Sequence, residues 1–192
     1  VGTRNTQNFE LLKAIGRQQT YPALLKRGFG ITLNESLNAA EYLASEGNSR
    51  VIFSLRGMKT NAGAPHRNMV DFAHVPVVKR LTRMPVCVDP SHSVGSRESA
   101  PDHILDLAHA TAQGVIAGAN LVLVDFHPQP RQALVDGPQA LLLDELPRLP
   151  NGKLDRRALA ARSLPRPAPA GGGSIVAPAD GNLIASGRLD LD

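Results

Sequence analysis

Short apolar runs recur along the first two thirds of the chain, each followed by polar residues and a longer amphipathic stretch. The runs are near-continuous in Val, Ile and Leu, which is typical of strands buried on both faces of a parallel sheet. They begin about 28 to 35 residues apart, which is the spacing of βα units. The pattern predicts four strands: Ala23–Leu25, Val51–Leu55, Val86–Val88 and Leu121–Phe126.

The stretches around these runs have apolar residues at helical spacing, and they predict four helices: Gln7–Ile15, Leu33–Ser45, Val70–Leu81 and His103–Ala117. Either Thr32 or Asn34 can cap the second helix, and Gly47 follows its end as a stop signal. Parallel strands that alternate with helices predict an α/β fold of the (β/α) barrel type. A complete barrel takes about 250 residues. Because the opening Val1–Arg4 resembles the end of a strand, we expect a partial barrel.

The last part of the chain has a different composition. Residues 164–173 read LPRPAPAGGG, a Pro-, Ala- and Gly-rich sequence that is typical of a linker. The residues after it are too few to bury a core of their own. We therefore divide the chain into a barrel part at 1–149, a short segment at 150–163, and a linker with a disordered tail at 164–192.

Composition narrows the range of partners. The net charge is +4, but Lys and Arg are spread along the chain and only 4% of residues are aromatic, which argues against nucleic-acid binding. The single cysteine, Cys87, excludes an intrachain disulfide and fits a reducing compartment. No apolar run approaches the roughly 18 residues of a membrane span, and no signal peptide is visible. We expect a cytoplasmic protein that binds neither nucleic acid nor membranes.

Cations follow three of the strands, counting the one that would precede residue 1. These residues are Arg4, Lys26 and Arg56. In a parallel barrel the carboxyl ends of the strands converge at the active site, where buried cations need anionic partners. Phosphate and carboxylate groups of a ligand would supply them. Any one of these cations taken alone is more simply explained as a surface salt-bridge partner, so the prediction rests on the set.

Two strands are followed by a carboxylate and an imidazole: Asp89 with His92, and Asp125 with His127. Such a cluster predicts a divalent cation such as Mn²⁺, Zn²⁺ or Fe²⁺. His127 is equally compatible with a role in the site and with none. The remaining histidines do not follow a strand, and we expect them on the surface or in helix packing: His66, His74, His103 and His109.

Six stretches in fixed order carry a resemblance to a known family: VGTRNTQNFELL, PALLKRGF, AAEYLASEGN, RGMKT with HRNMVDFAHVPVVK, PVCVDPSHSVGSR, and VDFHPQPRQALVDGPQAL. As a set, over residues 1–143, they resemble the 3-deoxy-arabino-heptulosonate 7-phosphate (DAHP) synthases, in the subgroup close to the 3-deoxy-octulosonate 8-phosphate synthases. The resemblance implies the C-terminal half of a (β/α)8 TIM barrel. It also implies a transferase that condenses phosphoenolpyruvate with an aldose phosphate, erythrose 4-phosphate in the shikimate pathway to the aromatic amino acids.

The resemblance further implies roles for individual residues. Arg4 and Arg56 would take the phosphate of phosphoenolpyruvate, and Lys26 would lie near its carboxylate and reacting carbon. Lys26 and His92 are therefore the catalytic candidates. The implied metal ligands are His92, Asp125 and Asp136. Mn²⁺ is the foremost metal, with Zn²⁺, Fe²⁺ and Co²⁺ as alternatives, in a Lewis-acid role.

The chain departs from the family in three places. Ser54 and Leu55 stand where the family has Cys and Glu, and Asp125 stands where it has a longer Glu. The family's N-terminal half, which carries a Cys ligand and a Lys-Pro-Arg-Thr-type loop, has no counterpart here. We therefore expect the chain to form a homo-oligomer or to pair with such a half.

A second resemblance covers residues 145–159, ELPRLPNGKLDRRAL, which look like the last motif of adenylation domains in nonribosomal peptide synthetases. Lys153 would be the lysine that reaches the adenylate there. The alternative is a turn at Asn151 and Gly152 followed by a basic helix. Two rival functions follow: a fragment of an adenylate-forming module, and a non-catalytic remnant or interaction module.

Overall fold

The computed structural model describes residues 1–62, 65–142, 144–147, 149, 155 and 157–158. The predicted linker and tail at 164–192 lie outside the described residues, as do Lys153 and most of the segment at 150–163. The domain boundaries proposed there stay predictions. Among the helices of the described part, none is both long and apolar enough to cross a membrane.

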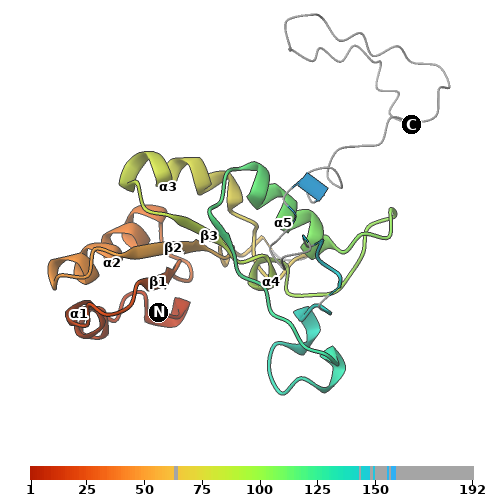
Figure 1. Ribbon diagram of the computed structural model, residues 1–192, viewed down its shortest axis with the longest axis horizontal. Helices are drawn as coiled ribbons and strands as arrows, with labels where there is room; N and C mark the ends of the chain where they lie inside the picture. The colour runs from red at the N-terminus through yellow and green to blue at the C-terminus, as the bar shows by residue number, and fades with distance from the viewer. Residues whose placement is uncertain (63–64, 143, 148, 150–154, 156, 159–192) are drawn as a thin grey trace, which may run out of the picture.

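Four parallel strands form one sheet in the order β1-β2-β3-β4 (Figure 1). They are β1 (Ala23–Lys26), β2 (Val51–Leu55), β3 (Val86–Val88) and β4 (Leu121–Val122). Lys26 is paired in register with Ser54, and Ser54 with Cys87. Because side chains alternate between the faces of a sheet, these three share one face, which we call the site face. The predicted parallel α/β fold is confirmed.

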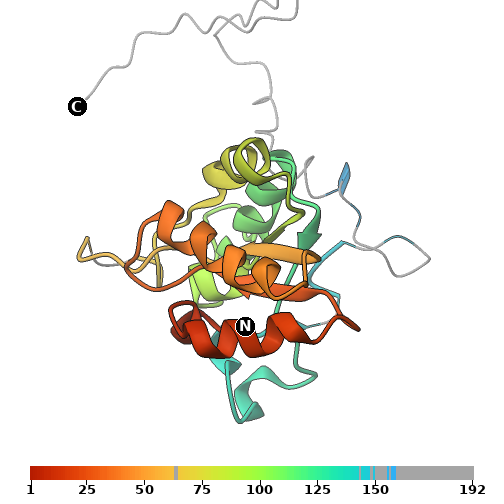
Figure 2. The same ribbon diagram turned by 90° about the vertical axis from the view of Figure 1, so that its left-hand side faces the viewer.

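Helices connect the strands, as expected for βα units. They are α1 (Phe9–Arg17), α2 (Leu33–Ser45), α3 (Val75–Thr82), α4 (Pro90–Val94) and α5 (Asp106–Ile116). Short 3-10 turns complete the set: η1 (Thr3–Asn5), η2 (Phe72–His74), η3 (Pro130–Gln132) and η4 (Gly137–Gln139). Helix α2 contacts β2, α3 contacts β3 and α5 contacts β4, while α1 packs along α2, as Figures 1 and 2 show.

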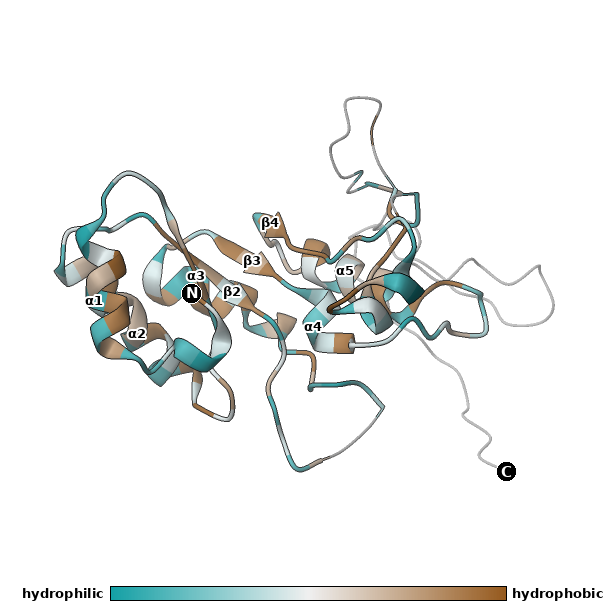
Figure 3. Cartoon of the chain, turned by 90° about the horizontal axis from the view of Figure 1, so that it is seen from below, coloured by the Kyte–Doolittle hydropathy of each residue, from teal (hydrophilic) through white to brown (hydrophobic). Residues whose placement is uncertain are grey.

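The other face of the sheet forms the core with the helices. Leu25, Phe53 and Leu55 are fully buried in one cluster with Val86 and Val88 of β3. Figure 3 shows the corresponding brown stretches along β2 and β3. Leu55 stands where the resembled family has Glu, and here it fills this apolar cluster. Its position is thus part of the packing, on the face of β2 opposite Ser54.

The capping of α2 is resolved in favour of Thr32. Its hydroxyl accepts a hydrogen bond from the backbone N–H of Glu35 at 3.2 Å, and the Glu35 carboxylate accepts one from the Thr32 N–H at 2.8 Å. This reciprocal pair is a capping box. Gly47 follows the helix with φ of +105°, the left-handed conformation of a helix stop, as predicted.

Strand β4 is shorter than predicted, because its neighbour changes course. Strand β3 ends at Val88 and the chain turns into α4, a helix that the apolar pattern did not predict. After Leu123, whose N–H still reaches the Val88 carbonyl, no backbone of β3 remains alongside. The N–H of Asp125 donates to the Ser91 hydroxyl of α4 at 2.9 Å. The predicted strand Leu121–Phe126 is therefore wrong in its second half.

Other boundaries shift for local reasons. Helix α5 begins at Asp106, because His103 is left-handed with φ of +63° and Ser99 pairs with Leu105 as an antiparallel bridge. At the start of the chain, Val1 pairs with the edge of β1: its amino group donates to the Leu24 carbonyl at 2.6 Å, and the Lys26 N–H donates to its carbonyl at 3.1 Å. The predicted strand end is thus limited to Val1, and the 3-10 turn η1 follows.

Candidate active site at the carboxyl ends of the strands

Asp89 joins two of the predicted site residues. It follows β3, caps α4 and is fully buried. One carboxylate oxygen, Oδ2, accepts from Lys26 Nζ at 2.8 Å, and the other, Oδ1, accepts from His92 Nδ1 at 3.0 Å and from the His92 backbone N–H at 3.1 Å. Burial pushes the pKa of Asp89 up, but the bonds from His92 and Lys26 outweigh it, and the pKa lies below the ordinary value. Asp89 is an ionised link between β1 and α4.

This link sets the tautomer of His92. Asp89 is ionised and can only accept, so Nδ1 of His92 carries the proton. The Nε2 lone pair is then free for a metal ion, the arrangement in which a carboxylate orients a ligating imidazole. From the sequence, Asp89 was predicted only as a member of a cation-binding cluster, and the structure places it behind His92 as the group that orients the imidazole.

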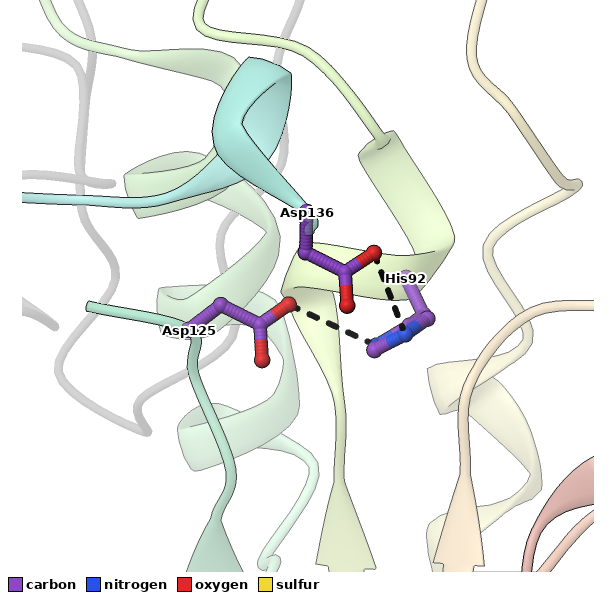
Figure 4. A group of neighbouring side chains, drawn as sticks. All are labelled: His92, Asp125 and Asp136. Carbon is purple, nitrogen blue, oxygen red and sulfur yellow. Dashed lines mark ion pairs between the residues drawn. The ribbon is translucent and has the colours of Figure 1, made fainter. Parts of the chain in front are cut away.

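His92, Asp125 and Asp136 lie together, and we call them the cation side. Figure 4 shows both carboxylates directed toward the imidazole. One ligand atom from each lies within 4.8 Å of the others. Nδ1 of His92 is 3.7 Å from Oδ2 of Asp125, and Nε2 is 4.0 Å from Oδ1 of Asp136. One imidazole and two carboxylates fit a divalent cation such as Mn²⁺, Fe²⁺ or Zn²⁺.

The backbone positions the two carboxylates from irregular segments. Asp125 is held between the Ser91 hydroxyl and Leu141, whose N–H donates to the Asp125 carbonyl at 2.8 Å. Asp136 precedes η4 in the left-handed conformation, with φ of +55°. That conformation is uncommon outside glycine but tolerated by Asp. It turns the chain back so that Asp136 faces His92 across from Asp125.

Gln139 is the residue of this region that sequence reasoning missed. It is 2% exposed, and its Nε2 donates to Oδ2 of Asp125 at 2.7 Å and to Oδ1 of Asp136 at 3.2 Å. Its Oε1 accepts from Nη1 of Arg67 at 2.9 Å. The only signal in the sequence was its place three residues after Asp136, inside a stretch that carried the family resemblance.

Arg4 and Arg56 meet at Phe29, and with Lys26 they form what we call the anion side. The guanidinium carbon lies 4.7 Å from the Phe29 ring centroid for Arg56 and 5.7 Å for Arg4. Arg56 is 1% exposed, and within the described residues its Nε and Nη1 have no hydrogen-bond partner. Burial lowers the pKa of Arg56, and the charges of Arg67 and Arg4 add to the effect. Two guanidinium groups at one ring, of which Arg56 has unused buried donors, fit a phosphate group.

Arg27, the next strand-end cation, has a structural role instead. It is 2% exposed, and its Nη1 donates to Oδ2 of Asp71 at 2.9 Å and to Nδ1 of His74 at 2.9 Å. Oδ1 of Asp71 accepts from the Gly57 N–H at 2.9 Å. The pair therefore ties the end of β1 to the residue after Arg56 and supports the anion side from below.

The other histidines lie outside the cation side. His127, which the sequence left open, accepts from the Gln129 N–H at 3.0 Å through its own Nδ1 and so closes a local turn. His66 lies 3.3 Å from Asp106, and His109 lies 3.0 Å from Asp102. His74 contacts Arg27, as described, and His103 is exposed at a turn.

The sequence and the fold of this chain are similar to those of known proteins. The model of the DAHP synthetase I family matches residues 1–156. The chain belongs to this family. The family assignment made from the sequence is confirmed, and the four-stranded sheet with its helices is part of a TIM barrel.

Curated members of the DAHP synthase group are similar in sequence. Phospho-2-dehydro-3-deoxyheptonate aldolase of Thermotoga maritima is 42% identical over 141 residues, which are 73% of this chain and 39% of that protein. A 2-dehydro-3-deoxyphosphooctonate aldolase of Pelobacter propionicus is 32% identical over 130 residues, which are 65% of this chain and 46% of that protein. The second relative agrees with the predicted subgroup.

Solved structures of the same group are similar in fold. The crystal structure of the Thermotoga maritima DAHP synthase superposes with a TM-score of 0.67 at 40% identity and covers 74% of this chain and 39% of its own. A truncated form of that enzyme has the same TM-score and identity, with 51% of its length covered. The chain therefore spans about two fifths to a half of the length of these DAHP synthases.

Proposed function

We propose that this chain supplies the phosphoenolpyruvate and metal sites of a DAHP synthase, which condenses phosphoenolpyruvate with an aldose phosphate, erythrose 4-phosphate. The observation that carries the proposal is the Lys26–Asp89–His92 chain of hydrogen bonds. Through this chain, the ammonium group that would bind phosphoenolpyruvate and the imidazole that would bind the metal are hydrogen-bonded to the same carboxylate. The two sites would therefore hold their ligands next to each other, as a reaction between two bound substrates requires.

Each residue then has a defined task. Arg56 and Arg4 bind the phosphate, since the unused guanidinium donors of Arg56 need an acceptor. Lys26, fixed by Asp89, directs its ammonium group at the carboxylate and reacting carbon of phosphoenolpyruvate. His92, Asp125 and Asp136 hold the divalent cation. Such a cation supplies Lewis-acid polarisation of the aldehyde or activation of water.

A cavity beside the cation side supports a second phosphorylated substrate. It has a volume of about 350 Å³, and its lining includes Lys59, His66 and Arg67. Nη1 of Arg67 lies 3.9 Å from Oδ1 of Asp136, and Asn68, also in the lining, donates to the backbone carbonyl of His92 at 2.7 Å, so the cavity adjoins the cation side. A cationic lining of this kind is suited to the phosphate of an aldose phosphate.

The proposal also covers the identity of the metal, the location of the protein and its assembly. Mn²⁺ is the metal that we propose first. Zn²⁺, Fe²⁺ and Co²⁺ are alternatives, because one imidazole and two carboxylates can bind each of these ions. A cytoplasmic location is part of the proposal, and it is supported by the single cysteine of the chain, which fits a reducing compartment. The chain would form a homo-oligomer or pair with an N-terminal half-barrel, and only the second assembly would bring in the remaining ligands of both sites.

Calorimetric titration of the chain with phosphoenolpyruvate and with Mn²⁺ tests the two sites. We expect Lys26→Ala to weaken phosphoenolpyruvate binding and His92→Ala to weaken Mn²⁺ binding, each by at least about tenfold. Lys13→Ala and His109→Ala, which alter the contacts with Glu10 and Asp102 and touch none of the proposed site residues, serve as matched controls. If the site variants bind like the wild type, the anion-and-metal interpretation is wrong.

Catalytic turnover by the chain is tested separately from ligand binding. Consumption of phosphoenolpyruvate in the presence of Mn²⁺ and erythrose 4-phosphate would be followed for the chain alone. Binding together with turnover supports the synthase. Binding without turnover supports the rival reading of a non-catalytic module that keeps the ligand sites.

A further inference from the structure

Gln139 is the one glutamine of the loop region 126–142 that is fully buried. It ends the turn η4 and is 2% exposed, whereas Gln129 and Gln132 of the same region are exposed. A glutamine side chain has few apolar atoms, so its burial is favourable only if its polar atoms are bonded. The buried position of Gln139 therefore depends on the hydrogen-bond partners of its amide group.

The amide of Gln139 is fully used. Its two N–H groups reach two different carboxylates, Asp125 Oδ2 at 2.7 Å and Asp136 Oδ1 at 3.2 Å. These are the same oxygens that face His92. One small group thus bridges the two acidic members of the cation side.

Arg67 determines which end of the amide faces the carboxylates. Its Nη1 donates to Gln139 Oε1 at 2.9 Å, and a guanidinium cannot accept a hydrogen bond. The oxygen of the amide must therefore point to Arg67, and the NH₂ group must point to Asp125 and Asp136. A flipped amide would set its oxygen against two carboxylates, and it would set its NH₂ against a cation.

The hydrogen bonds from Gln139 reduce the repulsion between the two carboxylates of the cation side. Two carboxylates aimed at one point repel each other until a cation binds, and both come from segments without regular backbone pairing. The bridge holds them at a spacing that admits one ion, so less ordering remains to be done when the ion binds.

We propose that Gln139 is the residue that positions the two carboxylates of the cation side and that Arg67 fixes the orientation of its amide. The inference rests on the proposed function in one respect, that the cation side binds a divalent metal. It goes beyond that function by assigning the metal affinity to a residue that does not touch the metal.

The test is Mn²⁺ binding to the full chain, measured from the electron paramagnetic resonance signal of free Mn²⁺ without substrates. Gln139→Met keeps the size of the side chain and removes its hydrogen bonds. We expect it to raise the Kd for Mn²⁺ by about 10- to 100-fold, the usual effect of removing a residue that orients a ligand. Gln132→Met, the same change at an exposed position, should alter the Kd less than about twofold.

Arg67→Met gives a second test, because it leaves Gln139 in place and changes a half-exposed side chain; it also removes a cation 3.9 Å from Asp136, which alone would strengthen Mn²⁺ binding, so a rise in Kd reports the lost orientation of the amide. With the amide free to rotate, we expect a smaller rise in Kd, about three- to tenfold. Thermal unfolding in the presence of a chelator separates binding from folding. A positioning role predicts little change in Tm without metal and a reduced gain in Tm when Mn²⁺ is added.

The outcomes are distinct. If Gln139→Met binds Mn²⁺ like the wild type while His92→Ala does not, Gln139 only fills space, and the proposed function stands. If Gln139→Met does not fold, an unchanged Kd for Arg67→Met overturns the inference and a raised Kd supports it. If the wild type itself binds no Mn²⁺, the inference and the metal part of the proposed function both fail.

Discussion

The anion side and the cation side of the site are built in different ways. Lys26 and Arg56 end or follow neighbouring strands, so the pairing of β1 with β2 sets their spacing. Asp125 and Asp136 lie in a region without extended pairing, where the Asp125 N–H donates to the Ser91 hydroxyl and the Gln139 amide donates to both carboxylates. The first arrangement is set by the sheet and by the buried Arg27–Asp71 pair beside it, whereas the second depends on hydrogen bonds to side chains of other segments. The cation side should therefore be the more easily disturbed by single substitutions around it.

The largest effect should come from breaking the support of the anion side. Asp71→Ala leaves the buried Arg27 guanidinium without its carboxylate partner and removes the acceptor of the Gly57 N–H. Removing one member of a buried ion pair costs about 3–5 kcal/mol in the free energy of unfolding. Urea unfolding measures this loss, and the folded fraction should still bind Mn²⁺ like the wild type.

Glu46→Ala provides the matched control, since it breaks the surface pair with Arg17, whose side chain is 62% exposed. Surface pairs contribute about 0–1 kcal/mol. Equal losses for the two variants would mean that Asp71 and Arg27 give the strand ends no special support. The comparison between the two sides would then lose its structural basis.

The second effect has opposite signs for stability and binding. Arg56→Met replaces a buried guanidinium, whose Nε and Nη1 find no hydrogen-bond partner in the described part of the chain, with an apolar side chain. We expect the affinity for phosphoenolpyruvate to fall at least about 30-fold, from a cost of about 2–5 kcal/mol. We also expect the ligand-free protein to gain stability, by up to about 1–4 kcal/mol. Calorimetry and urea unfolding measure the two changes.

A stability loss in Arg56→Met would contradict this account, because it would show that the guanidinium is well solvated or partnered without ligand. Arg50→Met, at an exposed position before β2, is the control and should change neither quantity appreciably. The contrast with the cation side is direct. There the bridging amide satisfies the carboxylates before any ion arrives.

Residues that are positioned by the sheet could be predicted from the sequence, whereas residues that are positioned by contacts between distant segments could not. The bounds of β2 and β3 were predicted as found, and the strand-end rule selected Lys26, Arg56 and His92, because a parallel sheet brings strand ends together whatever the loops do. The same rule could not separate Lys26 from Arg27, since their different roles depend on Asp71, which is 44 residues from Arg27 in the chain. The end of β4 was misplaced because the turn of β3 into α4 removes its partner. Gln139 and Arg67 were missed because their roles exist only through contacts between segments that are 72 residues apart.

The smallest expected effect is that the thiol of Cys87 does not react with a labelling reagent in the native protein. This measurement tests whether water is excluded from the site face beneath the anion side. Cys87 lies on that face in register with Ser54 and is 1% exposed. Burial raises the pKa of its thiol to about 11, with a further contribution from the charge of Asp89. At pH 8 only about 0.1% of the thiol is ionised, and the thiolate is the reactive form.

A colorimetric disulfide reagent should therefore leave Cys87 unmodified in the native protein at pH 8 and react with it at once in urea. Because the folded pKa is raised, reactivity should appear only as the pH approaches 11. Rapid labelling of the native protein at pH 8 would mean that water reaches the site face below Lys26. The pair between Lys26 and Asp89 would then lie in a medium of high dielectric constant, where ionic contacts are weak. In that case the sheet would not hold the anion side more firmly than Gln139 holds the cation side.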